Sequence, residues 1–196
     1  MRNLESAMKA FPQAQFRVSW KPFFLDPSIP VEGEWLDDYI LRVYGRKMDL
    51  STSDHPLNQA GSKAGITFAY PRLVVNTMKS HRLVEYAGIQ GADFQDKVIE
   101  LLFSRYFENL EDISSSDVLI KIAEDAGLNG AQTLEFLKTE QYKSEVAQQY
   151  EAAKRMRISG VPHFIISKGT KGRKIQLSGG QPVAAFKEAF EELGER

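Results

Sequence analysis

Cysteine is absent from all 196 residues, and this absence removes one kind of chemistry. Without a thiol, these residues can form no disulfide and offer no thiolate nucleophile. The absence also removes the usual clue to the redox compartment, because cysteine usage normally separates secreted from cytosolic proteins.

Long hydrophobic runs and a strong charge of one sign are missing as well. No apolar run approaches the roughly 18 residues of a membrane span. The formal net charge is −1, with no basic stripe. We therefore expect neither a membrane nor a nucleic acid as a partner. Arg2 is followed by no apolar core like that of a signal peptide, which favours a cytoplasmic over a secreted location.

Histidine is scarce. His55, His81 and His163 lack the spacing of metal ligands, so we expect no metal site. The remaining composition, 42% hydrophobic and 26% charged, is that of an ordinary globular protein. The length suits one domain, or one domain with a large insertion.

The N-terminal quarter of the chain predicts a mixture of helix and strand. Residues 2–10 have a helical apolar face, and residues 15–20 alternate as a strand with Phe16, Val18 and Trp20 on one side. Residues 34–44 predict a helix that ends at Gly45. We assign the nearby aromatic side chains to core packing: Trp20, Phe23, Phe24 and Trp35.

From about His55 to Met156 the pattern is helical almost throughout. Ser114–Asp117 has the signature of a capping box, and Gly127 is the expected end of the helix that follows.

The C-terminal segment predicts strand, hairpin, strand and helix. Phe164–Ile166 is a short β-branched run, Lys168–Gly172 is the connection, and Arg173–Leu177 alternates as the second strand. Gln181-Pro182 opens a helix. Its apolar side chains are Val183, Phe186, Phe190 and Leu193.

These features resemble the DsbA-like thioredoxin superfamily, specifically its FrnE-type branch. The resemblance covers essentially the whole chain and is carried by four segments: Trp20–Phe23, Asn76–Leu83, Ile158–Phe164 and Leu177–Pro182. It implies an α/β, thioredoxin-like fold with a large inserted all-helical domain. We place the discontinuous thioredoxin-like domain at residues 1–50 and 157–196, and the helical insertion at residues 51–156.

The family also implies a first strand that ends in Cys-x-x-Cys at the start of the first helix. Met1 already matches that helix, so we expect the first strand to be missing and the chain to be a truncated form of a longer enzyme. Two alternatives stay open, in which the flanking strands pair directly or another chain supplies the strand. We therefore assign no catalytic residue.

The resemblance implies a substrate-binding loop at Val161-Pro162 with a cis peptide bond, beside His163. In glutathione-binding relatives, the loop that matches Gly179-Gly180-Gln181 holds a carboxylate of the ligand, so the resemblance implies a binding role for these residues. The helix that carries Asn76, His81 and Arg82 is expected to face the cleft between domains. Without the resemblance, the same residues also allow three ordinary structural roles. Pro162 could follow a trans peptide bond, His81 could be a partly buried, hydrogen-bonded side chain, and the glycines could form a tight turn.

The inherited function is thiol–disulfide exchange, which this chain lacks the nucleophile to perform. One alternative is a glutathione-dependent relative of 2-hydroxychromene-2-carboxylate isomerase and kappa-class glutathione transferase. Another is a non-catalytic module that binds peptides at the proline loop. The expected partner is a protein or peptide substrate, with glutathione and a second copy of the chain as further alternatives.

Overall fold

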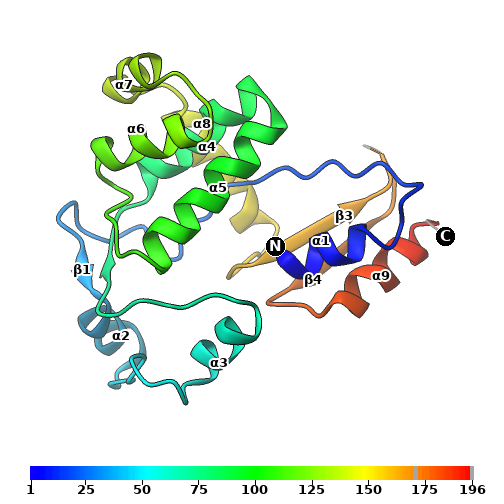
Figure 1. Ribbon diagram of the computed structural model, residues 1–196, viewed down its shortest axis with the longest axis horizontal. Coiled ribbons are helices and arrows are strands. Elements are labelled where there is room, and N and C mark those ends of the chain that lie inside the picture. The colour runs from blue at the N-terminus through cyan, green and yellow to red at the C-terminus, as the bar shows by residue number, and fades with distance from the viewer. Residues whose placement is uncertain (170–171, 195–196) are drawn as a thin grey trace. The chain divides into compact units, whose positions relative to one another are not determined.

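The computed structural model describes residues 1–169 and 172–194. Their contacts divide the chain into two compact units (Figure 1). The discontinuous unit joins Met1–Val18 to Glu151–Arg196, and the helical unit is the contiguous stretch Ser19–Tyr150. The sequence placed residues 19–50 with the discontinuous unit, whereas their contacts in the structure are with the helical unit.

The discontinuous unit is a two-stranded sheet with two helices, in the part of the chain that is described. The strands are antiparallel, with His163 opposite Ser178 and Phe164 opposite Leu177. Its elements are α1 (Arg2–Met8), β3 (His163–Ser167), β4 (Lys174–Ser178) and α9 (Val183–Glu192). Thr170 and Lys171 of the predicted hairpin connection lie outside the described residues.

The core of this unit forms where α1 and α9 meet the sheet. Its buried members are Ala7, Phe11, Phe186 and Phe190. Phe164 of β3 meets Phe186 edge-to-face, with ring centroids 4.9 Å apart. The helical spacing of α9 and the alternation of β3 thus direct apolar side chains into one shared core, as the sequence predicts.

The predicted strand at residues 15–20 is wrong. The segment is not a strand, although its burial alternates as the pattern predicts. Phe16 packs on Phe190 in the discontinuous unit, at 4.7 Å between centroids. The Trp20 indole instead donates to Asp96 of the helical unit, 2.6 Å away. The segment passes from one unit to the other, and no partner strand pairs with it among the described residues.

The helical unit contains most of the helices and one small ladder. Its elements are β1 (Glu34–Trp35), α2 (Leu36–Tyr44), α3 (Pro56–Lys63), β2 (Leu73–Val74), α4 (Met78–Gln90), α5 (Ala92–Phe107), α6 (Ser116–Asp125), α7 (Gly130–Lys138) and α8 (Lys143–Arg155), whose last turn belongs to the discontinuous unit. Glu34 lies opposite Val74 and Trp35 opposite Leu73. The inserted part is therefore not all-helical.

Local signals account for several helix ends. Gly45 ends α2 in the left-handed conformation, with φ of 67°, as predicted. After α6, Gly127 has φ of 94° and Leu128 N–H donates to the Ala123 carbonyl. The predicted helix at 34–44 begins two residues late, because Glu34 and Trp35 pair with β2 instead.

The predicted capping box at Ser114–Asp117 is wrong. The residue that precedes α6 is Ser115, and its side chain makes no capping hydrogen bond. The Ser114 hydroxyl donates to Asp112 instead, at 2.6 Å. A local turn around Asp112 therefore satisfies the serine that the motif requires.

Among the described residues, no helix has the length and apolar character needed to cross a membrane.

Candidate substrate-binding site

Two loops of the discontinuous unit lie against each other at one end of the sheet. The first precedes β3 and contains Val161 and Pro162, whose peptide bond is cis. The second follows β4 and begins with Gly179. The Gly179 N–H donates to the Pro162 carbonyl at 2.8 Å, which continues the ladder one step beyond the strands. The sheet register therefore brings two predicted site segments into direct contact.

His163 stands at the first position of β3, and both of its ring nitrogens have partners on β4. Nδ1 lies 2.8 Å from the Ser178 hydroxyl, and Nε2 lies 3.0 Å from Gln176 Oε1. Because an amide oxygen only accepts, Nε2 carries a proton and donates to Gln176. The imidazole is thus held across the sheet.

The second loop is fixed by side chains. Gly179 has φ of 82°, a conformation that favours glycine. The Gln181 side-chain amide donates back to the Ser178 carbonyl at 2.5 Å, and Asn3 of α1 donates to the Gln181 carbonyl at 2.8 Å. A side chain at Gly180 would meet no atom within 4 Å. The loop is held at both ends and open at its middle.

Val161 presents free polar groups beside an exposed side chain. Half of the residue's surface is exposed. Within residues 1–169 and 172–194, its main-chain N–H and C=O make no hydrogen bond. Unpaired main-chain groups next to a strand are what an extended peptide requires for main-chain pairing.

Asn76, His81 and Arg82 belong to the helical unit. The Asn76 side chain accepts a hydrogen bond from the Met78 N–H at 3.0 Å, at the start of α4. Asn76 therefore shapes the first turn of this helix, in the manner of an Asx turn.

His81 points into a group of aromatic rings. Its Nε2 lies 3.2 Å from the Phe23 carbonyl, so this nitrogen carries the proton. The ring of Phe24 meets the imidazole edge-to-face at 5.0 Å. Burial lowers the pKa of His81 from its ordinary value of 6.5 to about 4, while the hydrogen bond to Phe23 opposes this shift. The imidazole is neutral at physiological pH.

Arg82 is buried, with 3% of its surface exposed. Its guanidinium donates to the carbonyls of Thr139 at 2.6 Å and Gln141 at 2.7 Å, and lies over the Phe136 ring at 5.1 Å. Desolvation lowers the pKa of this group. Arg82 thus satisfies carbonyl groups beyond the end of α7, where helix carbonyls lack intrahelical partners.

The predicted site residues thus fall into two sets. Six come together in the discontinuous unit: Val161, Pro162, His163, Gly179, Gly180 and Gln181. The other three lie in the helical unit. Among the described residues, no group of three acidic or histidine side chains is arranged to hold a metal ion.

Sequence reasoning missed a small cavity in the helical unit. It is lined by Trp35, Leu36, Asp37, Tyr70 and Pro71. The assignment of Trp35 to the core is wrong, since 54% of this residue is exposed. No local signal marks this exposure, because Leu36, which lies between Trp35 and the acidic residues, is itself buried.

Three features together define a thioredoxin-like protein with an insertion. The discontinuous unit has helices packed on a sheet, its Val161-Pro162 loop has a cis proline before β3, and the contiguous helical unit lies in sequence between its two parts. The chain belongs to the DSBA-like thioredoxin domain family, which matches residues 1–191.

Comparisons with individual proteins give one relative by sequence and two by structure. The Bacillus subtilis (strain 168) protein YwbO, described as uncharacterized, is 27% identical over 156 residues, which are 76% of this chain and 71% of that protein. A probable DsbA oxidoreductase from Streptomyces coelicolor has a structure similar over 99% of this chain and 83% of its own, with a TM-score of 0.84 and 23% identity.

A candidate protein disulfide isomerase from Nitrosomonas europaea aligns over 79% of this chain and 86% of its own, with a TM-score of 0.60 and 16% identity. At these identities the two structures demonstrate a shared fold. The DsbA-like fold predicted from the sequence is confirmed.

Proposed function

We propose that these 196 residues bind an extended polypeptide at the Val161 loop and do not themselves exchange disulfides. The observation that carries the proposal is the pair of main-chain groups on Val161 that stay unpaired within the described residues, beside a half-exposed side chain and a loop anchored by Gly179. The family membership supports a substrate with disulfide chemistry. The absence of cysteine leaves these 196 residues without the nucleophile for it.

Main-chain pairing explains how such a site would work. A peptide in extended conformation pairs its own N–H and C=O with those of Val161, which gives affinity with little sequence selectivity. Neighbouring His163 is already bonded on both ring nitrogens, so it shapes the loop rather than binding the peptide through a hydrogen bond. Asn3 and Gln181 hold the second loop in place.

A matched pair of valine substitutions tests the proposal. Val161→Glu places a charge at the loop, and Val31→Glu makes the same change at a site that is 88% exposed in the helical unit. Binding is measured by fluorescence anisotropy of a labelled, cysteine-free unfolded peptide. We expect V161E to weaken binding at least tenfold and V31E to change it less than twofold. Equal effects of both variants would contradict the proposal.

The same purified protein also tests whether the chain lacks disulfide-exchange activity. The 196-residue chain is expected to leave the rate of insulin disulfide reduction by dithiothreitol at its uncatalysed value. Acceleration that survives removal of contaminating thiol enzymes would refute this part of the proposal.

A second candidate ligand is glutathione, which would bind at the Gly179–Gln181 loop. The observation that favours it is the start of α9, where Pro182 provides no side-chain cap and Gly180 faces open space. Free N–H groups there suit a carboxylate. Addition of S-methylglutathione should then shift the amide resonances of Gly180 and the first turn of α9. Unchanged resonances at millimolar ligand would contradict glutathione binding, and with it a function like that of the glutathione-dependent isomerases and transferases.

The FrnE-type branch, the cytoplasmic location and a second copy of the chain as partner stay predictions.

A further inference from the structure

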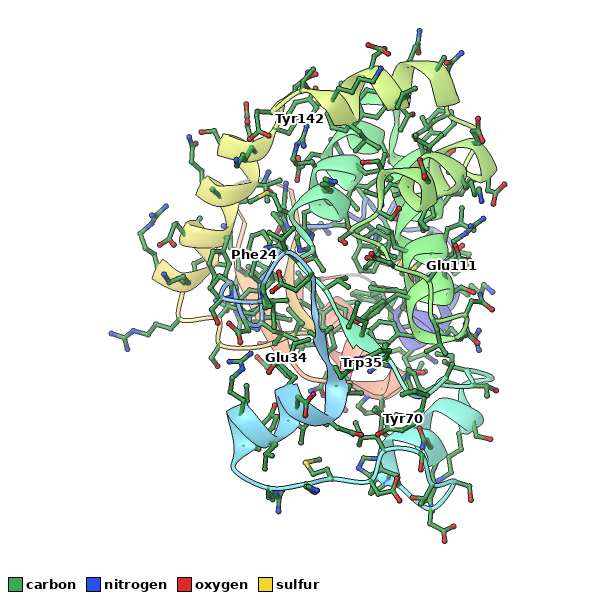
Figure 2. The ribbon with its side chains drawn as sticks, turned by 90° about the vertical axis from the view of Figure 1, so that its left-hand side faces the viewer. Phe24, Glu34, Trp35, Tyr70, Glu111 and Tyr142 are labelled. Atoms are coloured by element: carbon green, nitrogen blue, oxygen red, sulfur yellow. The ribbon has the colours of Figure 1, made fainter. Side chains whose placement is uncertain are left out.

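The cavity between β1, the start of α2 and the Tyr70-Pro71 segment is separate from the loops described above. Its volume is about 160 Å³. Pockets for drug-sized molecules begin near roughly 300 Å³, so this one suits a single side chain or a small amine. Figure 2 shows Trp35 and Tyr70 on neighbouring segments of the same face, near the end of β1.

One wall of the cavity is aromatic and aliphatic. Trp35 is 54% exposed, although tryptophan is usually highly buried in a folded chain. Pro71 and Leu36 complete the apolar lining. An exposed indole offers a negative ring face, and of the aromatic side chains it attracts cations most strongly.

The polar feature of the cavity is the pair formed by Tyr70 and Asp37. The Tyr70 hydroxyl donates to Asp37 Oδ2, which leaves the remaining lone pairs of the carboxylate available. This hydrogen bond, with a smaller effect from burial, raises the pKa of Tyr70 to about 12, so the hydroxyl stays a donor at physiological pH. In the described part of the chain Asp37 makes no ion pair, whereas the nearby Arg42 is bonded to Asp26 and Glu34.

We propose that this cavity binds an alkyl cation, namely a guanidinium or ammonium group on an aliphatic stem, with the charged head on Asp37 and the stem against Trp35 and Pro71. A carboxylate and an indole face attract the same positive charge, and the apolar lining accepts the methylene groups. A neutral ligand of the same size would cover the Asp37 carboxylate without compensating its charge, which is unfavourable. The proposal does not depend on the function proposed for the Val161 loop.

The chain offers an internal reference for a binding measurement, because it contains two tryptophans. Trp35 lines the cavity, and the indole N–H of Trp20 is bonded to Asp96 elsewhere in the unit. The probe is Nα-acetyl-arginine methylamide, titrated while the two indole N–H resonances are followed. We expect saturable shifts of Trp35 and a constant Trp20. The neutral isostere Nα-acetyl-citrulline methylamide should bind at least tenfold more weakly. Equal binding of the two probes would overturn the proposal without any mutation.

Adjacent acidic residues supply the matched variants. Asp37→Asn removes the charge in the cavity, and Asp38→Asn removes the same charge from an exposed neighbour that does not line it. We expect D37N to weaken binding of the arginine probe at least tenfold and D38N less than twofold. Equal weakening would overturn the proposal, since it would indicate general attraction to an acidic surface. Preserved chemical-shift dispersion establishes that each variant is folded.

A second arm identifies the source of the cation. A pentapeptide with one central arginine is compared with the amide probe. Tighter binding of the pentapeptide would support an arginine of a polypeptide as the ligand, and equal binding would support a small free molecule that carries the same cationic group. Binding of neither probe below 50 mM would overturn the proposal.

Discussion

At the scale of single residues, His81 and Arg82 are neighbours on α4 with different roles. Arg82 keeps its charge and satisfies it with the carbonyl groups of Thr139 and Gln141. His81 has one carbonyl partner and aromatic neighbours, so its charged form is disfavoured. One buried cation is therefore paired with acceptors, and one buried base is held neutral.

The lowered pKa of His81 predicts that acid destabilises the protein through this residue. The folded-state pKa of about 4 lies below the ordinary value of 6.5, so the unfolded chain binds the proton first as pH falls. The contribution of neutral His81 to the free energy of unfolding is fully present above pH 6.5. It is lost as pH falls toward 4, by up to roughly 3 kcal/mol. It is measured as the free energy of unfolding by urea at pH 7 and pH 4.5.

His81→Gln is the control, because glutamine keeps an N–H donor for the Phe23 carbonyl and does not titrate. The variant should lose less stability than the parent between pH 7 and pH 4.5. The same loss in both proteins would contradict the assignment of acid sensitivity to His81.

At the scale of secondary structure, the end of α2 depends on the backbone freedom of one glycine. Gly45 has φ of 67°, and its N–H donates to the Leu41 carbonyl at 2.9 Å. A side chain there would meet no neighbouring atom, so any cost of substitution comes from the backbone conformation alone.

We predict that Gly45→Ala lowers the free energy of unfolding by about 1 kcal/mol. Gly160→Ala is the comparison, since Gly160 also faces open space but its φ lies outside the left-handed range. That variant should be neutral or slightly stabilising. The measurement is thermal and urea unfolding of both variants, and equal stabilities would contradict the role given to the Gly45 conformation.

The elements that could be predicted from the sequence are those whose signal is local. The ends at Gly45 and Gly127 and the apolar side of α9 are properties of a few consecutive residues. The strand at 15–20 could not be predicted correctly, because a strand requires a partner that its own alternation does not specify. Trp35 was misplaced for a related reason, since its exposure depends on how β1 pairs with β2.

The candidate site divides in the same way. The contact between the Pro162 and Gly179 loops follows from the hairpin register, which two adjacent strands define. The roles of His81 and Arg82 depend on Phe23, Thr139 and Gln141, which lie more than 50 residues away in sequence. Periodicity places a side chain on a face, but it does not name the distant groups that this face meets.

At the scale of the whole molecule, the chain leaves the discontinuous unit after Val18 and returns to it at Glu151. We predict that the helical unit acquires stable structure first. Joining α1 to α9 before that closes a loop of about 175 residues, at an entropic cost on the order of 5 kcal/mol, whereas α4 and α5 are adjacent in sequence. Pulse-labelled hydrogen exchange during refolding should protect α4 and α5 before β3 and α9. Earlier protection of α9 would contradict this order.

The same discontinuity has a consequence for synthesis on the ribosome. Phe11 and Phe16 are made at the start, but their partners Phe186 and Phe190 are made at the end. At typical elongation rates this interval is on the order of ten seconds or more. During that time the N-terminal aromatic side chains have no core to enter, so the nascent chain exposes to chaperones two rings that the finished protein packs against α9.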